Sequence, residues 1–225
     1  MARDALDRKI SHLKDEVLLQ GSKVEGMILD AVGALVTRDQ AVFQQILSYD
    51  RQINQKHQEI EKQCLSLITT EPPILAKDLR LLTSLLEINT MLEHFGDNAK
   101  GIARTGLILS QEPPHKNLSN ISNLAGEIID LFHQVLGAFV NEDCNFVRTA
   151  PRTLDAIRAR SEQITQDYLS LMIVDPSSMN QANKLLWVIH ILEQIAVRVI
   201  DICERTNYIL TGDLTSFKSS IMEVE

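Results

Sequence analysis

Residues 32–39 read VGALVTRD, and the same pattern returns as LGAFVNED at residues 136–143, displaced by 104 positions. A second pair keeps that displacement, because CLSLI at residues 64–68 matches YLSLM at residues 168–172. Further along, residues 85–102 match residues 185–202 at a displacement of 100. The matches keep their order and the displacement changes once, which indicates that the chain contains two copies of one unit.

Within each copy, apolar residues recur at steps of three and four, which places them on one face of a long helix. The first copy has three such stripes, around residues 17–35, 42–67 and 79–109, and the second repeats them around residues 121–138, 157–171 and 185–202. Three long helices with short turns form an antiparallel bundle. The sequence therefore predicts an all-α fold of two tandem three-helix bundles, residues 1–109 and 120–225, joined by a linker at residues 110–119.

Residues that start and stop helices stand between the stripes. Asp39, Asp78 and Asp143 are predicted N-caps, because a short carboxylate accepts the free N–H groups of a first helical turn. The Pro-Pro pair at residues 72–73 is expected to end a helix, and Gly212 to end the last one.

Composition narrows the class of function. The formal charge is −8, from 22 Lys and Arg against 30 Asp and Glu, and no Lys/Arg cluster stands out, so no nucleic-acid partner is expected. The three cysteines lie far apart with no CxxC pair, which is typical of free thiols in a reducing compartment. The first residues are too charged for a signal peptide, and the densest apolar run, residues 185–189, is too short to span a bilayer. We therefore expect a cytoplasmic protein that reaches a membrane only through a partner.

The most site-like residues lie in the third stripe of each copy. Glu93 and Asp97 are four residues apart, so both carboxylates leave the same helix face and could share a divalent cation. Gly96 between them would let another group approach closely. In the second copy Glu193 and Asp201 lie two turns apart and Val197 replaces the second carboxylate, so this site is expected to be weaker. A solvated acidic surface is the commoner explanation of such a pattern.

Other candidates are weaker still. Tyr49 belongs to the second apolar stripe, and Trp187 has apolar neighbours at helical spacing, so both are expected in the core. His94 and His190 stand near the glutamates, but no ExxH pair of the di-iron bundle type occurs. Phosphate-binding loops and the nucleophile motif GxSxG are absent from the sequence. We therefore expect no catalytic residues.

The run from residue 68 to residue 103, ITTEPPILAKDLRLLTSLLEINTMLEHFGDNAKGIA, resembles the PhoU family. The resemblance rests on a Pro-containing turn, then Asp78-Leu79-Arg80, then Leu92-Glu93 and Gly96-Asp97 in that order, and it extends over roughly residues 6–212. It implies a non-enzymatic negative regulator of phosphate uptake and phosphate-starvation signalling. The implied partners are a phosphate ABC transporter and a membrane sensor histidine kinase, with a homodimer left open.

The resemblance also implies site residues. The two acidic motifs would bind iron, zinc or another divalent metal through Glu93 and Asp97 and, more weakly, through Glu193 and Asp201, whereas Asp78 and Arg80 are candidates for partner docking. The family arginine after each glutamate is here His94 or Gln194, which favours a diverged member. Such a member could serve a sodium- or proton-coupled phosphate carrier instead. The sequence also leaves open a purely structural helical scaffold and, less favoured, a metal-dependent enzyme.

Overall fold

The computed structural model of the protein describes residues 2–70, 74–113 and 118–217, and these residues form helices without any strand. The all-α prediction is confirmed. The first copy comprises α1 (Ala2–Thr37), α2 (Gln40–Thr70) and α3 (Ala76–Leu109). The second copy comprises α4 (Ser119–Asn141), α5 (Cys144–Val174), a short 3₁₀ turn η1 (Pro176–Ser178) and α6 (Met179–Thr211).

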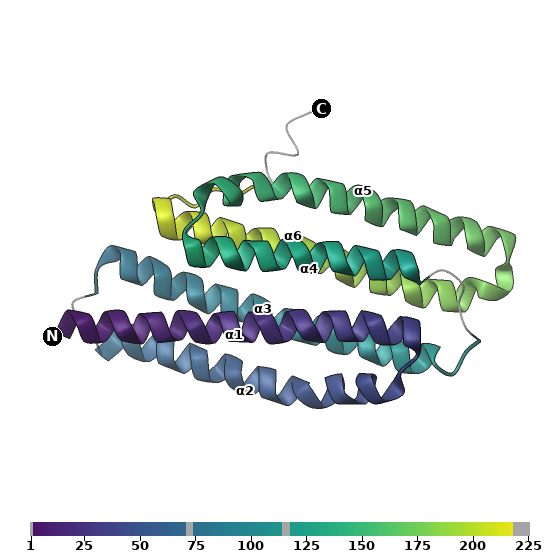
Figure 1. Ribbon diagram of the computed structural model, residues 1–225, viewed down its shortest axis with the longest axis horizontal. Helices are drawn as coiled ribbons and strands as arrows, with labels where there is room; N and C mark the ends of the chain where they lie inside the picture. The colour runs from purple at the N-terminus through teal and green to yellow at the C-terminus, as the bar shows by residue number, and fades with distance from the viewer. Residues whose placement is uncertain (1, 71–73, 114–117, 218–225) are drawn as a thin grey trace.

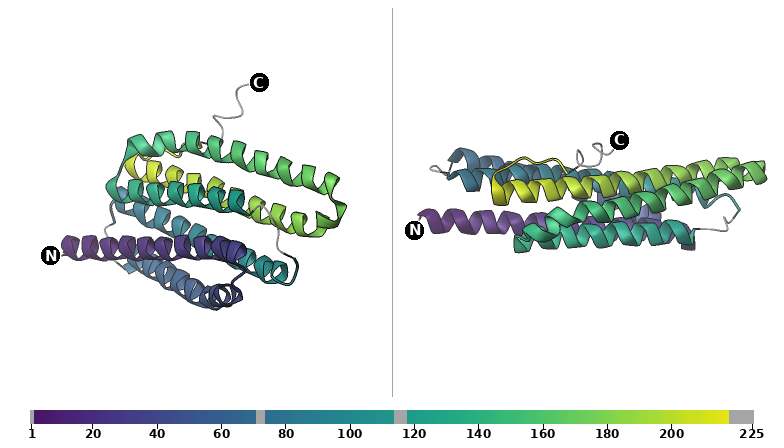
Figure 2. Two further views of the ribbon diagram at one scale, coloured as in Figure 1. Left: turned by 45° about the vertical axis from the view of Figure 1, so that its right-hand side comes forward. Right: turned by 90° about the horizontal axis from the view of Figure 1, so that it is seen from above.

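The two three-helix bundles lie side by side along their length (Figure 1). In the middle of the molecule, α3 packs against α6 and α1 packs against α4, whereas α2 and α5 cover the two outer edges. Seen from above, α3 and α6 share one layer and α1 and α4 share the other (Figure 2). The face formed by α3 and α6 therefore belongs to both copies.

Contacts between α1 and α4 show how the copies are related. The Lys14 amine donates to the Val140 carbonyl at 3.3 Å, and Glu25 pairs with His133 at 3.5 Å, eleven residues further along α1 but seven residues earlier in α4. The two helices are therefore antiparallel. Because equivalent helices of the two copies pack antiparallel, the copies are related by a pseudo-twofold rotation and not by a translation.

One continuous hydrophobic core runs through both bundles. Phe95 of α3 and Phe132 of α4 are fully buried and pack edge to face, with ring centroids 5.2 Å apart. The Leu136 side chain of α4 packs directly on Gly21 of α1, and a Cβ added to Gly21 would stand 2.6 Å from the Leu136 Cδ1. The division into domains at residues 1–109 and 120–225 thus stays a prediction, since the halves share their core.

The turns that follow α1 and α4 are built alike. Arg38 and Glu142, which occupy equivalent repeat positions, both take left-handed backbone angles, with φ of 60° and 55°. The next residues, Asp39 and Asp143, each accept hydrogen bonds from backbone N–H groups in the first turn of the following helix. Both predicted N-caps are confirmed.

Two other helix-end predictions fared differently. Gly212 ends α6 with φ of 84°, as predicted. Asp78 is not an N-cap: Leu75 holds that position, and Asp78 is the third residue of α3, where its carboxylate accepts the Leu75 N–H at 3.2 Å. The prolines at residues 72–73 lie outside the described residues.

Two aromatic side chains expected in the core are partly exposed. Tyr49 of α2 is 38% exposed and Trp187 of α6 is 46% exposed. Each ring is only partly covered by the neighbouring helices. The stripe pattern shows which face of a helix points inward, but the width of the covered band depends on the neighbouring helices.

Acidic motifs and the shared helix face

The α3–α6 face is held together by two contacts between the bundles. The Arg205 Nε of α6 lies 2.7 Å from the Glu87 Oε2 of α3. The Trp187 ring lies on Gly101, where an added Cβ would be 3.0 Å from the Cη2 atom. Because α3 and α6 are antiparallel, residues 93–97 of one and residues 193–197 of the other lie at the same level between these contacts. The structure therefore brings both acidic motifs to the same level of the neighbouring helices α3 and α6.

In the first motif, each carboxylate has a nitrogen partner close by in the chain. The Glu93 Oε2 is 3.5 Å from the His94 Nδ1, and the Asp97 Oδ1 is 3.6 Å from the Lys100 Nζ. The side chains of Glu93 and Asp97 are 24% and 48% exposed. Lys100 offsets part of the repulsion between the two carboxylates, so the motif can exist without a bound cation.

Gly96 does not lie on the acidic surface, where it was expected to let another group approach the two carboxylates. It is buried, and an added Cβ would stand 3.2 Å from the Ile53 Cγ2 of α2. Phe95 beside it packs against Phe132 of the other bundle. The small and the apolar residue of this motif therefore position α3 in the core, whereas Glu93, His94 and Asp97 face outward.

The second motif is turned toward α5. The hydroxyl of the buried Ser161 on α5 lies 3.4 Å from the Glu193 Oε2 and can donate to it. Val197, which stands where the first copy has Asp97, packs partly buried against the core. Asp201 is partly exposed two turns further along α6. Glu193 and Asp201 are thus separate carboxylates on one helix.

The donor atoms bear on the predicted metals. In residues 2–70, 74–113 and 118–217, no cluster of three or more His, Cys, Asp or Glu side chains is arranged to hold an ion. Zinc in proteins takes about four ligands, usually nitrogen and sulfur, which these residues do not offer. Two carboxylates one turn apart do fit a hydrated hard cation that keeps several of its waters. The donor set therefore favours a magnesium-like ion over zinc.

Asp78 and Arg80, the predicted docking residues, both make contacts within the fold. Asp78 is only 5% exposed, and the Arg3 guanidinium of α1 donates to its carboxylate at 2.9 Å. This hydrogen bond holds the pKa of Asp78 below its usual range. Arg80 lies beside Gly212, where a positive charge faces the carboxyl end of α6. Both residues tie helix ends together, and a role in docking stays a prediction.

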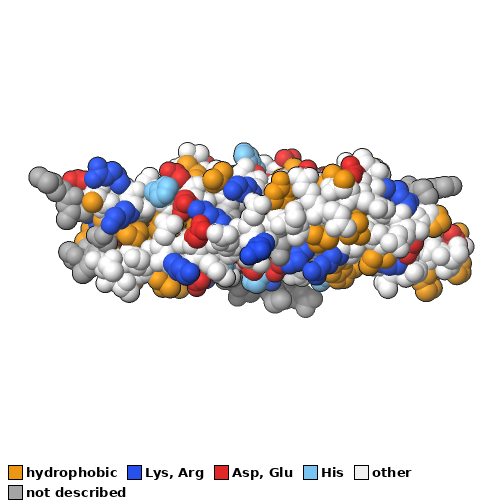
Figure 3. Space-filling view, turned by 90° about the horizontal axis from the view of Figure 1, so that it is seen from below, with side chains coloured by type: hydrophobic (Ala, Val, Ile, Leu, Met, Phe, Trp, Pro, Cys, Tyr) orange, Lys and Arg blue, Asp and Glu red, His pale blue; other side chains and the backbone are white. Residues whose placement is uncertain are grey.

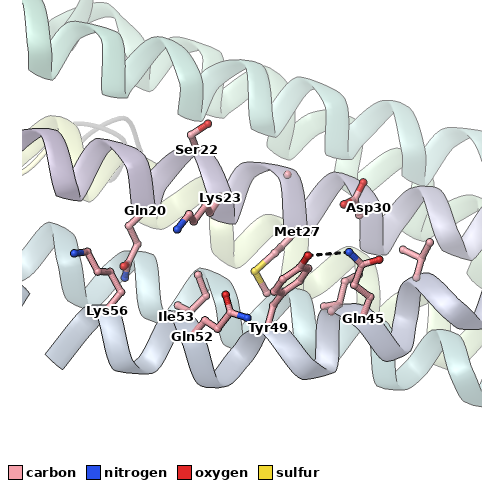
Figure 4. A pocket seen from close by; sticks show the side chains of 13 residues that line it. Gln20, Ser22, Lys23, Met27, Asp30, Gln45, Tyr49, Gln52, Ile53 and Lys56 are labelled. Carbon is pink, nitrogen blue, oxygen red and sulfur yellow. Dashed lines mark hydrogen bonds between the residues drawn. The ribbon is translucent and has the colours of Figure 1, made fainter. Parts of the chain in front are cut away.

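The structure also contains a cavity that sequence reasoning missed. It opens between α1 and α2, has a volume of about 290 Å³, and includes Gln20, Lys23, Met27, Tyr49 and Lys56 in its lining (Figure 4). Seen from below, acidic and basic side chains are interspersed on the molecule without one dominant sign (Figure 3). The signal in the sequence was slight: Gln20 is a polar residue next to the first apolar stripe, at a position where the second copy has Leu124.

Comparison with known proteins shows that the chain is similar to proteins named as phosphate-transport accessory proteins. The PhoU domain model matches residues 17–105. A PhoU homologue of Clostridium acetobutylicum, named a phosphate-specific transport system accessory protein, is 30% identical over 212 residues, covering 94% of this chain and 97% of the relative. A homologue of the same name from Caulobacter vibrioides is 29% identical over 210 residues, covering 92% and 91%.

Two solved structures share the fold. PhoU from Pseudomonas aeruginosa superposes with a TM-score of 0.86 at 24% identity, covering 92% of this chain and 99% of that one. The phosphate transport system regulatory protein PhoU from Streptococcus pneumoniae gives a TM-score of 0.87 at 24% identity, covering 94% and 100%. In the part of the chain that the structure describes, no helix is both long and apolar enough to cross a membrane.

Proposed function

The chain belongs to the PhoU family, and from this premise we propose that it regulates phosphate uptake by docking to a phosphate transporter. The family is one of regulatory accessory proteins and not of enzymes. The observation that carries the proposal is the match to a phosphate-transport accessory protein over 94% of the chain and 97% of that relative. A likeness that spans both bundles supports a shared role for the whole molecule, and not only for one helical unit.

We place the docking site on the α3–α6 face. Trp187 supports this choice, because a partly exposed tryptophan braced against Gly101 offers a rigid apolar anchor of the kind that dominates protein interfaces. The acidic motifs flank it and would pair with basic residues of the partner. Because both bundles contribute to the face, the affinity of a partner docked there would also depend on how the two bundles pack together.

The proposed partners are the cytoplasmic parts of a phosphate ABC transporter or another phosphate carrier, and a membrane sensor histidine kinase. The protein would then be cytoplasmic and recruited to the membrane by these contacts. A second copy of the chain competing for the same face would be detected as a homodimer. The sign of the regulation expected from the family resemblance is negative.

Docking is tested by isolating the tagged protein from cells grown at high and at low phosphate. We expect phosphate-transporter subunits to copurify, in amounts that change with phosphate, and Trp187→Ala to reduce them about tenfold or more. Leu65→Ala is the matched control, because Leu65 is 48% exposed but lies on α2. Equal recovery with both variants would refute the placement on the α3–α6 face. An unchanged phosphate response in a deletion strain would refute the regulatory role itself.

A divalent cation at the first acidic motif is a separate proposal. The pair of Glu93 and Asp97 would hold it with water completing the shell, whereas Val197 removes a ligand from the second motif. Metal bound to the purified protein should decrease mainly in Glu93→Gln/Asp97→Asn and little in Glu193→Gln/Asp201→Asn. Equal losses in the two double variants would show that the ranking is wrong.

A further inference from the structure

The cavity between α1 and α2 has the composition of a ligand site. Met27, Ile46 and Ile53 give it an apolar wall, and the Tyr49 ring lies at its mouth, where the Gln45 amide donates to the Tyr49 hydroxyl at 2.9 Å. A volume of about 290 Å³ lies just below the range of roughly 300–1,000 Å³ that is usual for small-molecule pockets. The cavity beside the partly exposed Tyr49 ring is therefore large enough for a small ligand.

A buried amide oxygen at this cavity has no partner. Gln20 is 1% exposed, and its side chain extends from α1 toward α2 between Lys56 and Ile53 (Figure 4). Its Nε2 makes one long contact of 3.5 Å with Asn89, whereas its Oε1 accepts no hydrogen bond from any described residue. A buried acceptor without a donor destabilises a fold. A ligand N–H entering the cavity would satisfy it.

Positive charge stands at the same end of the cavity. The Lys23 amine lies on the Gln20 side, one helical turn along α1, whereas Asp30 lies at the other end (Figure 4). Lys23 forms no ion pair with the residues that the structure describes, whereas Lys56 is paired with Glu16 and Glu59. An anion bound beside the Gln20 amide would therefore meet the free Lys23.

The second bundle has different side chains at the positions equivalent to Gln20, Lys23 and Lys56. The counterparts of Lys23 and Lys56, at a displacement of 104, are Glu127 and Arg160, and these pair at 3.0 Å across α4 and α5. The counterpart of Gln20 is Leu124, which is fully buried. Opposite charges thus join the helices of the second bundle at this place, whereas in the first bundle Lys56 pairs with Glu16 and Glu59 and Lys23 has no ion-pair partner among the described residues. The second bundle also has a hollow between α4 and α5, but Asn120 and Arg160 line it, and neither Leu124 nor Glu127 takes part.

We propose that the α1–α2 cavity binds a small organic carboxylate that has an apolar or aromatic body and an N–H group next to its anionic end, as N-acyl amino acids have. The N–H donates to the Gln20 Oε1, the carboxylate pairs with Lys23, and the body packs on Met27 and under Tyr49. This site is distinct from the α3–α6 face and does not depend on the proposed function.

The test uses three probes on the intact protein, followed by ¹H–¹⁵N chemical shifts. N-acetyl-L-phenylalanine has all three features, its N-methylated analogue lacks the N–H, and its carboxamide lacks the charge. We expect N-acetyl-L-phenylalanine to reach half-saturation at about 1 mM or below, with shifts at cavity residues. The N-methylated probe should bind about tenfold more weakly, because it leaves the Gln20 oxygen unpaired.

Two variants copy the second bundle into the first. Gln20→Leu should bind N-acetyl-L-phenylalanine and its N-methylated analogue equally, since the acceptor is gone. Lys23→Glu should pair with Lys56, close the cavity and abolish binding while keeping the helices stable. Lys62→Glu makes the same charge change at an exposed position of α2 outside the cavity and should bind like the parent protein.

Three outcomes would overturn the proposal. The first is the absence of saturable shifts at cavity residues up to about 10 mM N-acetyl-L-phenylalanine, roughly tenfold above the expected constant. The second is equal binding of the N-methylated probe to the parent protein. The third is discrimination between the two probes that survives in Gln20→Leu. If circular dichroism shows that Gln20→Leu does not fold, the binding of N-acetyl-L-phenylalanine to Lys23→Glu is compared with its binding to Lys62→Glu. Equal binding by those two variants overturns the proposal.

Discussion

Replacing Gly106 by alanine should destabilise the protein, although alanine is the better helix former. Gly106 lies in the last turns of α3, and an added Cβ would stand 2.2 Å from the Phe43 Cζ and 2.4 Å from its Cε1. Carbon atoms in contact lie about 3.5–4.0 Å apart, so the ring would have to retreat by more than an ångström. Phe43 is fully buried and its ring is rigid, so the helices must shift apart.

The magnitude follows from two opposing effects. Overfilling a packed core costs about 1–3 kcal/mol, and the higher helix propensity of alanine returns at most about 1 kcal/mol. We expect a net loss of about 1–2 kcal/mol. In a chain of this length each kcal/mol corresponds to about 2–4 °C, so the midpoint of thermal unfolding should fall by about 2–8 °C.

Thermal unfolding followed by circular dichroism measures the effect. Gly126→Ala is the matched control, because Gly126 lies inside α4 with no atom within 4 Å of the added Cβ, and its midpoint should rise by about 2–4 °C. Adding Phe43→Leu to Gly106→Ala removes the ring atoms nearest the new methyl group and should recover part of the loss. A rise for Gly106→Ala equal to that of Gly126→Ala would refute the reasoning.

Three further predictions concern helix ends and thiols. Asp78→Asn should lower the free energy of unfolding by about 1–3 kcal/mol at neutral pH. Because the bond from Arg3 keeps the pKa of Asp78 low, this difference should persist above pH of about 4 and vanish as the pH falls below it, as denaturant unfolding across pH will show. Glu142→Gly should raise stability by about 0.5 kcal/mol, since glycine accepts the left-handed angles, whereas Asn141→Gly, at the last residue of α4, should lower it. Only Cys144 should react with a disulfide-exchange reagent near neutral pH, because burial raises the pKa of the other two thiols to about 11 and about 12; fast reaction of three thiols would contradict this.

Part of the candidate site could be predicted because its chemistry is local. The carboxylates of Glu93 and Asp97 share a helix face at any position in a fold, since the spacing of four residues determines this. Gly96 was misplaced because helical spacing does not tell which neighbour covers a residue: Ile53, 43 positions earlier, approaches it. Asp78 was expected to cap α3, but it is the third residue of that helix and is buried beside Arg3, which lies 75 positions earlier in the chain.

The sequence by itself determined the helices, their caps at Asp39 and Asp143, and the twofold repetition, because these depend on residue spacing and on hydrogen bonds within a few positions. Only the tertiary structure decided how the copies face each other and which residues their contact leaves exposed. Trp187 lies on Gly101 because α6 runs antiparallel to α3. The cavity at Gln20 lies where Lys23 has no ion-pair partner among the described residues, whereas Glu127 and Arg160 pair across α4 and α5, and such charges meet only once the helices are packed.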